Sequence, residues 1–544
     1  MKRIFLPSVL MLSTAAMAFG QSAVDALQLS QNDFRGTARF MSMGGAFTAL
    51  GGNLSTLSQN PAGIGIYRHS EIGATLDIDI QNTRGKSGNY SITNNQTKAA
   101  CNNFGYVGVA QLDGIMECFQ WGVTYGRKTS FDRLYSGYQM GTATSMSNYV
   151  ASFSNGYTDE TLNFGDNYNP YFDSDADWLS ILSYSGYLIN PVAGSNSQYQ
   201  GLFRNGTNGD SYLTVREKGY VDEYNFNFGG NFSNMIYWGL GIGVTDLNYT
   251  RITDYSESME NAAIPNAQRG QTGDAGFTLS NYKHITGSGW NIKFGLIFKP
   301  VNEFRIGAAI HSPTWYSLDH NYSANLGYSY YDPSRGDVSG ADNSIENNPL
   351  AGNENTDVAS FSWRLRAPWR FMVGAAAVVG GKFILSADYE YLAYNDMTIK
   401  NANYDGYGYL NDYVDNTAVN SDIKAYTQAG SVIRVGAEYR VTPQFSVRAG
   451  YNVALSNIKS DVRDGGVEVI TSGTDPSFSL DKNRNNISVG LGYRIGSVSI
   501  DAAYVHTTRQ STLKPYTNFN GNVAPSYDIR DHNNNIVLSL GFRF

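Results

Sequence analysis

The sequence contains few of the features that mark enzymes, metal proteins or helical membrane proteins. It has only two cysteines, Cys101 and Cys118, and its six histidines are scattered along 544 residues. No His-Glu-x-x-His or compact metal spacing occurs, and no Gly-x-Ser-x-Gly lies in a strand–turn–helix context. We therefore predict that the chain is not an enzyme and that it has no metal site and no cofactor.

Long apolar runs are also missing beyond the N-terminus. A membrane-spanning helix needs about 20 predominantly apolar residues, and no stretch after residue 20 approaches that length. Residues 1–20 begin with Lys2 and Arg3 and continue with an apolar run and small residues, which is typical of a cleaved secretory signal. The net charge of −8 makes nucleic acid a poor partner. The sequence predicts an exported protein without membrane-spanning helices.

Tyrosine and glycine are abundant instead. The chain has 39 tyrosines and 58 glycines against 14 prolines, and 13% of its residues are aromatic. In an exported protein this composition favours an outer-membrane β-barrel, which has aromatic girdles and a polar interior. The dense tyrosines also leave haem capture open as an alternative, because tyrosine can be a haem ligand.

Short segments with period-2 alternation recur to the last residue. The segment from Trp238 to Val244, for example, alternates large apolar side chains with glycine, as a strand with two different faces does. Fourteen such segments predict an all-β fold, a 14-stranded antiparallel transmembrane β-barrel. They start near Ile66, Asn103, Cys118, Tyr220, Met235, Phe277, Phe304, Ser360, Phe383, Ser431, Phe445, Asn486, Val498 and Asn534.

The links between these segments alternate between short and long. Short links such as Gly380–Lys382 predict periplasmic turns, and long links such as Gln81–Asn102 and Lys128–Gly219 predict extracellular loops. A soluble sandwich has no reason to alternate in this way. The second predicted hairpin separates Cys101 from Cys118 by about 25–30 Å at ~3.3 Å per residue, so we expect free thiols rather than a disulfide.

The chain ends on an aromatic residue of an alternating strand. Ile536, Leu538, Leu540 and Phe542 share one face with the terminal Phe544. This ending resembles the signal that the barrel assembly machinery reads during outer-membrane biogenesis. The simpler interpretation, a last strand that closes the sheet, is compatible with it.

Residues 21–65 do not follow the strand pattern. From Gln31 to Gly65 small residues dominate, and apolar residues recur with neither a period of 2 nor one of 3.6. Small residues allow close backbone approach. We therefore predict that residues 21–65 form a hatch inside the lumen, and that residues 66–544 form the barrel.

Several short motifs resemble the FadL/TodX family of outer-membrane transporters for hydrophobic compounds. Within the hatch they are Asn32-Asp33-Phe34, Met43-Gly44-Gly45-Ala46 and Asn60-Pro61-Ala62-Gly63. In the barrel, Arg305-Ile306-Gly307 with Ser312-Pro313, and Arg448-Ala449-Gly450-Tyr451, resemble strand patterns of the family. Where the family often has Ala-Asp-Asp before the Asn-Pro-Ala motif, this chain has Gly51-Gly52-Asn53, so a role for those acids does not carry over.

The resemblance implies passive uptake of long-chain fatty acids or aromatic hydrocarbons, which bind in the barrel and leave sideways through its wall. It implies a monomer that contacts outer-membrane lipid and lipopolysaccharide and has no energy coupling. A general porin for polar solutes is an alternative, although a hatch argues against it. A surface receptor or adhesin that works through its long loops is another.

Candidate ligand-binding residues fall in three places. The loop Lys128–Gly219 contains two amphipathic stretches, one from Met146 to Phe153 and one from Trp178 to Ile189 that includes Leu182. They either form a capture groove or pack on each other over the barrel mouth. Phe34 is expected to line the pocket. Inward-facing polar residues are expected mainly to hold the hatch, but Arg305 or Arg448 is a candidate partner for a ligand carboxylate. This inward set is Arg305, His311, Arg366, Arg370, Asp388, Glu390, Glu438 and Arg448.

Overall fold

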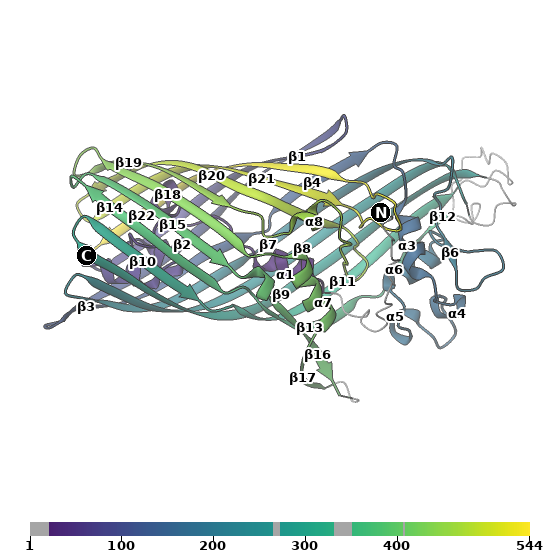
Figure 1. The fold of residues 1–544 in the computed structure, drawn as a ribbon, viewed down its shortest axis with the longest axis horizontal. Coiled ribbons are helices and arrows are strands. Elements are labelled where there is room, and N and C mark those ends of the chain that lie inside the picture. Colours follow the sequence, from purple (N-terminus) through teal and green to yellow (C-terminus); the bar gives the residue numbers. More distant parts are fainter. Residues whose placement is uncertain (1–20, 265–271, 331–350, 406–408) are drawn as a thin grey trace, which may run out of the picture.

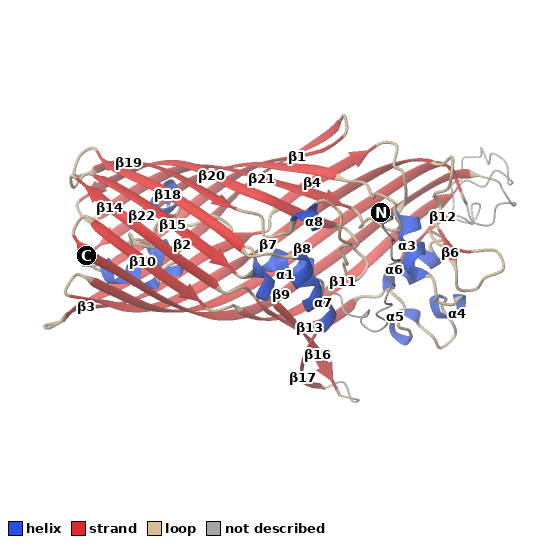
Figure 2. Cartoon of the chain, viewed as in Figure 1, coloured by secondary structure: helices blue, strands red, loops and turns tan. Residues whose placement is uncertain are grey.

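One closed antiparallel barrel makes up most of the molecule (Figure 1). The computed structural model describes residues 21–264, 272–330, 351–405 and 409–544, so the predicted signal at 1–20 lies outside the described residues. Strands form the long wall, and short helices lie inside it and beyond one end (Figure 2). No helix within the described ranges is long and apolar enough to cross a membrane.

Fourteen strands cross the wall, as the sequence predicts, and because some of them are interrupted we call each complete crossing a stave. Eleven of them are single strands, and three are broken into two or three strands each. The single strands are β1 (Glu71–Ser87), β2 (Tyr90–Gln111), β7 (Asn208–Phe232), β8 (Ile236–Ala262), β9 (Gly273–Val301), β15 (Phe383–Leu392), β18 (Gly430–Arg440), β19 (Phe445–Ala454), β20 (Phe478–Ile495), β21 (Val498–Lys514) and β22 (Tyr527–Arg543). The broken staves are β3 (Met116–Ser130) with β4 (Arg133–Gln139), β10 (Phe304–His311) with β11 (Trp315–Tyr330), and β12 (Ala351–Asn355) with β13 (Ala359–Arg366) and β14 (Arg370–Val379).

The first and last strands close the barrel. β1 pairs with β22 from Glu71 opposite Arg543 to Lys86 opposite Asp528. Two of the broken staves contain proline at the break, Pro313 and Pro368, and proline has no N–H to give to a ladder. A side hairpin of β16 (Thr398–Tyr404) and β17 (Leu410–Asp415) leaves the wall next to β13.

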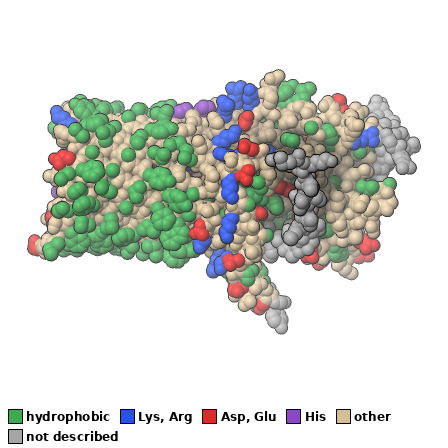
Figure 3. Space-filling view, viewed as in Figure 1, with side chains coloured by type: hydrophobic (Ala, Val, Ile, Leu, Met, Phe, Trp, Pro, Cys, Tyr) green, Lys and Arg blue, Asp and Glu red, His purple; other side chains and the backbone are tan. Residues whose placement is uncertain are grey.

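On the face shown in Figure 3, apolar side chains gather in a belt over the half of the barrel near the C-terminus. In β8 the outward Leu240, Ile242 and Val244 are exposed, while Gly239, Gly241 and Gly243 between them face inward. The belt matches the lipid-facing band of an outer-membrane barrel. The alternation in the sequence therefore predicts correctly which side chains face the lipid.

The strands are longer than the alternating segments. β8 has 27 residues and β9 has 29, although the alternation predicts only about ten. The predicted loop Gln81–Asn102 is wrong, because β1 and β2 continue through it to a turn at residues 88–89. The predicted loop Lys128–Gly219 is shorter than expected, because β4 and the start of β7 lie within it. Beyond the membrane the outward face becomes polar, so the alternation disappears while the backbone ladder continues.

The hatch lies inside the barrel, in the half near the C-terminus (Figure 1). Its short helices are α1 (Ala23–Ser30), α2 (Ala38–Ser42), η1 (Leu54–Ser58) and η2 (Pro61–Ile66). Nearly all of residues 37–65 are buried. Helix α1 lies higher in the barrel, where it packs on α7 (Thr417–Tyr426).

Wall glycines give the hatch its space. A Cβ added to Gly295 would lie 1.8 Å from Asn60 Oδ1, and one added to Gly239 would lie 2.2 Å from the Pro61 carbonyl. The same conflict recurs around the barrel, so the hatch backbone packs directly on the wall backbone. The wall glycines whose Cβ would meet the hatch within 3 Å are Gly73, Gly229, Gly239, Gly295, Gly307, Gly374, Gly436, Gly450 and Gly490.

A small domain of helices covers the extracellular end. Helices α3 (Met146–Ser154) and α6 (Trp178–Ser185) occupy the two stretches that the sequence predicts. The apolar faces pack on each other and on the upper ends of β7, β8, β9 and β11. The other elements of this domain and of the upper loops are α4 (Asp159–Leu162), α5 (Pro170–Asp173), β5 (Asn190–Pro191), β6 (Tyr199–Gln200), η4 (Tyr394–Asp396) and α8 (Ser460–Arg463).

Candidate functional site

The Asn-Pro-Ala-Gly motif anchors the hatch. Asn60 is fully buried and caps η2, because its Oδ1 accepts from the backbone N–H of Ala62 at 3.0 Å. Its Nδ2 donates to the Thr48 carbonyl at 2.6 Å and to the wall carbonyl of Leu296 at 3.4 Å. Pro61 stands at the first position of η2, where its missing N–H leaves no bond unmade. This predicted hatch motif therefore lies in the lumen and holds two hatch segments to β9.

The Asn32-Asp33-Phe34 motif binds the third stave. Asp33 Oδ2 accepts from the backbone N–H of Ser130 at 2.9 Å, and the Asp33 N–H donates to the Lys128 carbonyl at 2.9 Å. Arg484 donates to Asp33 Oδ1 at 2.8 Å and to the Asn32 carbonyl. The motif thus ties the start of the hatch to the upper end of β3.

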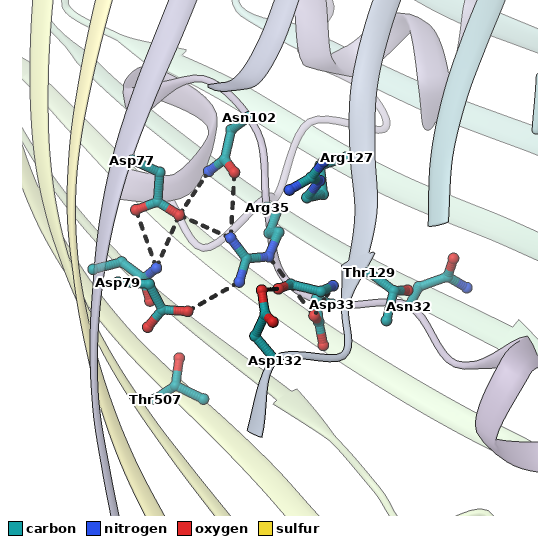
Figure 4. A network of polar contacts seen from close by, with 12 residues as sticks. Asn32, Asp33, Arg35, Asp77, Asp79, Asn102, Arg127, Thr129, Asp132 and Thr507 are labelled. Carbon is teal, nitrogen blue, oxygen red and sulfur yellow. Dashed lines mark hydrogen bonds and ion pairs between the residues drawn. The ribbon is translucent and has the colours of Figure 1, made fainter. Parts of the chain in front are cut away.

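Arg35 reaches from the same segment to the first two staves (Figure 4). Its guanidinium donates to Asp77 at 2.9 Å and to Asp79 at 3.0 Å on β1, and to Asn102 at 3.3 Å on β2. All four side chains are largely buried. Asp33 and Arg35, two residues apart in the hatch, therefore connect β3 on one side with β1 and β2 on the other.

The wall has a break between these two attachments. The β2–β3 ladder ends at Asn103 opposite Gly126. Above that point β2 pairs with β1, and β3 pairs with β7. Strand β4 does not rejoin β2; it pairs with β7 and packs on the inner side of β1, where a Cβ on Gly85 would lie 1.8 Å from the Ser136 carbonyl. The hatch segment 32–35 spans the inside of this break.

A cavity of about 180 Å³ lies between the hatch and the upper wall. Residues 31–36 form its floor, and it runs from the break to the upper ends of β18, β19 and β20. Phe34, Phe40, Leu392, Tyr394 and Val432 give it an apolar part. Its charged lining has eight basic and four acidic side chains, namely Arg35, Arg127, Lys128, Arg370, Arg434, Lys482, Arg484 and Arg509 against Asp33, Glu223, Glu390 and Asp481.

One group in this lining has more positive than negative charge. Glu390 accepts from Arg370 at 2.6 Å and also from Arg434, so two guanidinium groups share one buried carboxylate. Arg434 Nη1 has no hydrogen-bond partner among the described residues. This triad can therefore attract an anionic group into the cavity.

The family model described as outer membrane protein transport protein (OMPP1/FadL/TodX) matches residues 217–544, more than half of the chain. The chain belongs to this family. It is therefore an outer-membrane transport protein, and members of the family are transport channels rather than enzymes.

Three solved structures are similar to this family member. A variant of the monoaromatic hydrocarbon channel TodX has 13% identity and a TM-score of 0.51, with 94% of this chain and 100% of that chain covered. A Pseudomonas aeruginosa FadL homologue has 15% identity and a TM-score of 0.48, with 94% and 99% covered. The Ralstonia pickettii toluene transporter TbuX has 15% identity and a TM-score of 0.46, also with 94% and 99% covered. No curated protein matches the sequence.

Arg448 and Arg305, the two predicted carboxylate partners, lie outside the cavity lining of this FadL/TodX protein. Arg448 faces Glu438 across the β18–β19 ladder and donates to it at 2.7 Å. It also donates to Asp501 at 2.6 Å, and Arg39 of the hatch donates to the same Glu438 at 2.9 Å. Arg305 donates to the Leu50 carbonyl at 3.0 Å. Both arginines therefore contact the hatch or its anchors.

Of the other predicted ligand-binding residues, one lies in the cavity lining and two lie outside it. Phe34 lines the cavity, and its contact with a ligand stays a prediction. Trp178 and Leu182 are buried in the extracellular helical domain, where Trp178 Nε1 donates to the Tyr171 carbonyl at 3.0 Å. Of the alternatives for the loop helices, this arrangement matches the packed one.

Half of the inward polar set contacts the hatch directly, namely Arg305, His311, Asp388 and Glu438. Asp388 accepts from the backbone N–H of Thr48 at 2.8 Å, and His311 Nε2 contacts the Gln59 carbonyl at 2.8 Å. The prediction that Arg366 faces inward is wrong, because Arg366 lies opposite the exposed Trp315 and points outward. The outward direction follows from the break at Pro368, which changes the register of the alternation. Both cysteines are free thiols, and no cluster of three metal-binding side chains exists in the described part of the chain.

Sequence reasoning did not single out Arg35, Arg434 or Arg484. A signal for Arg35 is nevertheless present, because Asp77 and Asp79 share the inward face of the first strand and need a buried cation. For Arg434, no local signal separates it from other inward arginines. Its position beside Arg370 depends on the pairing of β15 with both β14 and β18.

Proposed function

We propose that this protein takes up hydrophobic molecules with an acidic end, such as long-chain fatty acids, and releases them sideways into the membrane. The observation that supports this most directly is the charged and partly apolar cavity that reaches the break between β2 and β3. Transport is passive, because the ligand moves down its own gradient. The buried hatch argues against a general porin, and no observation favours a receptor or an adhesin.

The lateral break provides an exit that suits a hydrophobic molecule. Asn102 and Asn103 of β2, and Gly126 and Arg127 of β3, stand on its two sides and also line the cavity. A molecule in the cavity can therefore move to the lipid without crossing the whole lumen. The hatch segment 32–35 spans this break from inside, so its ion pairs must loosen for the ligand to pass.

The charges of the cavity favour an acidic ligand over a neutral hydrocarbon. Arg370 and Arg434 share Glu390, and Arg434 Nη1, which has no hydrogen-bond partner among the described residues, could donate to a ligand carboxylate. Charge-assisted hydrogen bonds to arginine contribute about 1.5–3 kcal/mol each. The aromatic side chains of Phe34 and Phe40 would contact the hydrocarbon part.

The test is uptake by cells that express Arg434→Gln. Glu390 keeps Arg370, so the fold should be retained. We expect the apparent affinity for a radiolabelled long-chain fatty acid to fall about tenfold or more, since one charge-assisted bond is lost. Uptake of toluene should not change. Arg440→Gln, on the same face of the same strand and outside the cavity, is the matched control.

Two results would contradict the proposal. If Arg434→Gln and Arg440→Gln take up the acid equally well, then Arg434 does not bind the ligand. If neither variant nor the wild type takes up fatty acid above a strain without the protein, the substrate class is wrong. Native mass spectrometry of protein extracted in mild detergent would then identify a co-purified compound.

We also propose that the protein acts as a monomer and is inserted by the barrel assembly machinery. The barrel is closed by its own first and last strands, so no partner chain is needed to complete the wall. Phe544 stands at the end of β22, and its backbone N–H donates to the Ser70 carbonyl at 3.0 Å. Deletion of Phe544 should lower the amount of inserted barrel, measured by heat-modifiable gel mobility.

A further inference from the structure

Two exposed arginines lie opposite each other on the outer face of the closing strand pair. The register of β1 and β22 places Arg84 opposite Arg530, and both side chains point outward between buried neighbours. In the next row Lys86 lies opposite Asp528. Like charges directly opposite each other destabilise a pair of strands. The arrangement therefore favours an anion that neutralises both arginines.

The protein itself supplies no such anion within the described residues. Among the residues that the structure describes, Arg84 donates only to the Ser91 hydroxyl, at 3.2 Å, and Arg530 has no ion-pair partner. The nearest acid in the register, Asp528, pairs with Lys482 at 3.6 Å. Arg84, Lys86 and Arg530 together form what we call the closing-strand basic patch. It has three positive charges on an exposed surface, with the exposed Asp528 beside them.

The patch stands at the height of lipid headgroups. Ile80 is the last exposed apolar residue of β1, and Arg84 lies four residues beyond it. Four residues span about 13 Å along an antiparallel strand, which is about 10 Å of height at a tilt near 40°. Figure 3 shows that lysine and arginine side chains gather in a band just beyond the apolar belt. Long basic side chains there can reach the phosphates of the outer leaflet.

We propose that the closing-strand basic patch binds the phosphate groups of lipopolysaccharide. The planar guanidinium groups of Arg84 and Arg530 are suited to bidentate contact with phosphate and are weakly hydrated. A phosphate between them removes the like-charge repulsion of the pair. The bound lipid would then stabilise the β1–β22 seam, where the barrel closes.

The test measures binding of purified lipid A to the full protein in detergent micelles. The probes are diphosphoryl lipid A and the same lipid after removal of both phosphates. The variant is Arg84→Gln/Arg530→Gln, and the control is Arg216→Gln/Lys218→Gln. The control residues are also exposed and outward, but they lie opposite Ile252 and Thr250 rather than opposite a like charge.

We expect wild type and control to bind diphosphoryl lipid A equally, and the arginine variant to bind it on the order of tenfold more weakly. The dephosphorylated lipid should bind all three proteins weakly. Equal binding by variant and control would overturn the proposal, as would binding that does not depend on phosphate.

A second measurement follows thermal unfolding, first without lipid and then with lipid A. Arg530→Gln alone should raise the thermal midpoint of lipid-free protein, because it removes the repulsion, and lipid A should raise the midpoint of wild type more than that of the variant. An unchanged or lower midpoint without lipid, together with an equal lipid response, would contradict the role of the pair. If the wild type forms dimers at every lipid A concentration and the arginine variant does not, a second copy of the chain occupies the patch instead.

Discussion

Gly450→Ala should displace the hatch from the wall without disturbing the wall itself. Gly450 is in β19, and a Cβ there would lie 2.0 Å from the Gly44 nitrogen and 2.3 Å from the Met43 carbonyl carbon. Ordinary van der Waals contact begins at 3.4 Å, so the hatch backbone must move by about 1.4 Å, the difference of the two distances. Gly44 has φ +62°, and a Cβ built on it would lie 2.7 Å from the Tyr451 carbonyl oxygen. The turn therefore has little freedom to adjust.

The expected energy follows from the same contact. Overpacking a well-packed site costs about 1–3 kcal/mol, which raises the population of a displaced hatch by about 5- to 150-fold. Hydrogen exchange at residues 41–46 should increase, and planar-bilayer recordings should show more frequent open events. Exchange in the β19–β20 ladder should stay as in wild type, because a wall residue with φ < 0 accepts alanine.

Gly276→Ala is the matched control for this change. Gly276 is also a wall glycine, but a Cβ there would meet only the Glu257 carbonyl at 3.7 Å. If Gly450→Ala and Gly276→Ala behave alike in exchange and conductance, the hatch does not depend on backbone contact with the wall. The interpretation of the wall glycines would then be wrong.

Three further predictions concern single charged side chains. Arg448→Ala should lower the thermal midpoint, since it leaves Asp501 without its partner and breaks a buried pair worth about 3–5 kcal/mol; loss of uptake with an unchanged midpoint would instead support a ligand role. Arg35→Met should increase hydrogen exchange at residues 31–36 while leaving the barrel ladder protected, and unchanged exchange there would show that Arg35 does not hold the break. Burial raises the pKa of Glu257, beyond the membrane in the extracellular domain, to about 7, so the folded domain favours the neutral acid and loses up to about 3 kcal/mol of stability as pH rises from 4.5 to 7. Limited proteolysis of residues 140–207 should therefore be faster at pH 8 than at pH 5, and Glu257→Gln should remove this difference; a pH dependence that survives in the variant would assign it to another group.

The class of fold follows from the sequence because the bilayer imposes a pattern that is local. Each strand needs apolar residues at every second position wherever it faces lipid, and the segments that start at Phe304, Phe383, Phe445 and Val498 begin at the predicted residues. The periplasmic ends are accurate because the turns are short and the belt begins beside them. The extracellular ends are not, because β1 and β2 continue as a ladder above the membrane without an apolar face.

Less of the candidate site than of the fold can be predicted from the sequence. The hatch motifs are visible as runs of small residues, and Phe34 is a correctly placed lining residue. Arg448 is the most conspicuous inward arginine in its strand, yet Glu438 and Asp501 already neutralise it. Which arginine retains uncompensated charge depends on partners from other strands, and sequence spacing within one strand does not contain that information.

The sequence by itself determined the membrane barrel, its fourteen staves and the presence of a compact segment of small residues to fill it, because alternation and residue size act over a few neighbouring positions. Only the tertiary structure decided that Asp33 and Arg35 span a break in the wall, that Arg370 and Arg434 meet at one carboxylate, and that Arg84 faces Arg530. The residues that meet are far apart in the sequence, and Arg84 and Arg530 are separated by 446 positions. Closing the barrel brings them together, and the register of the closure determines which charges meet.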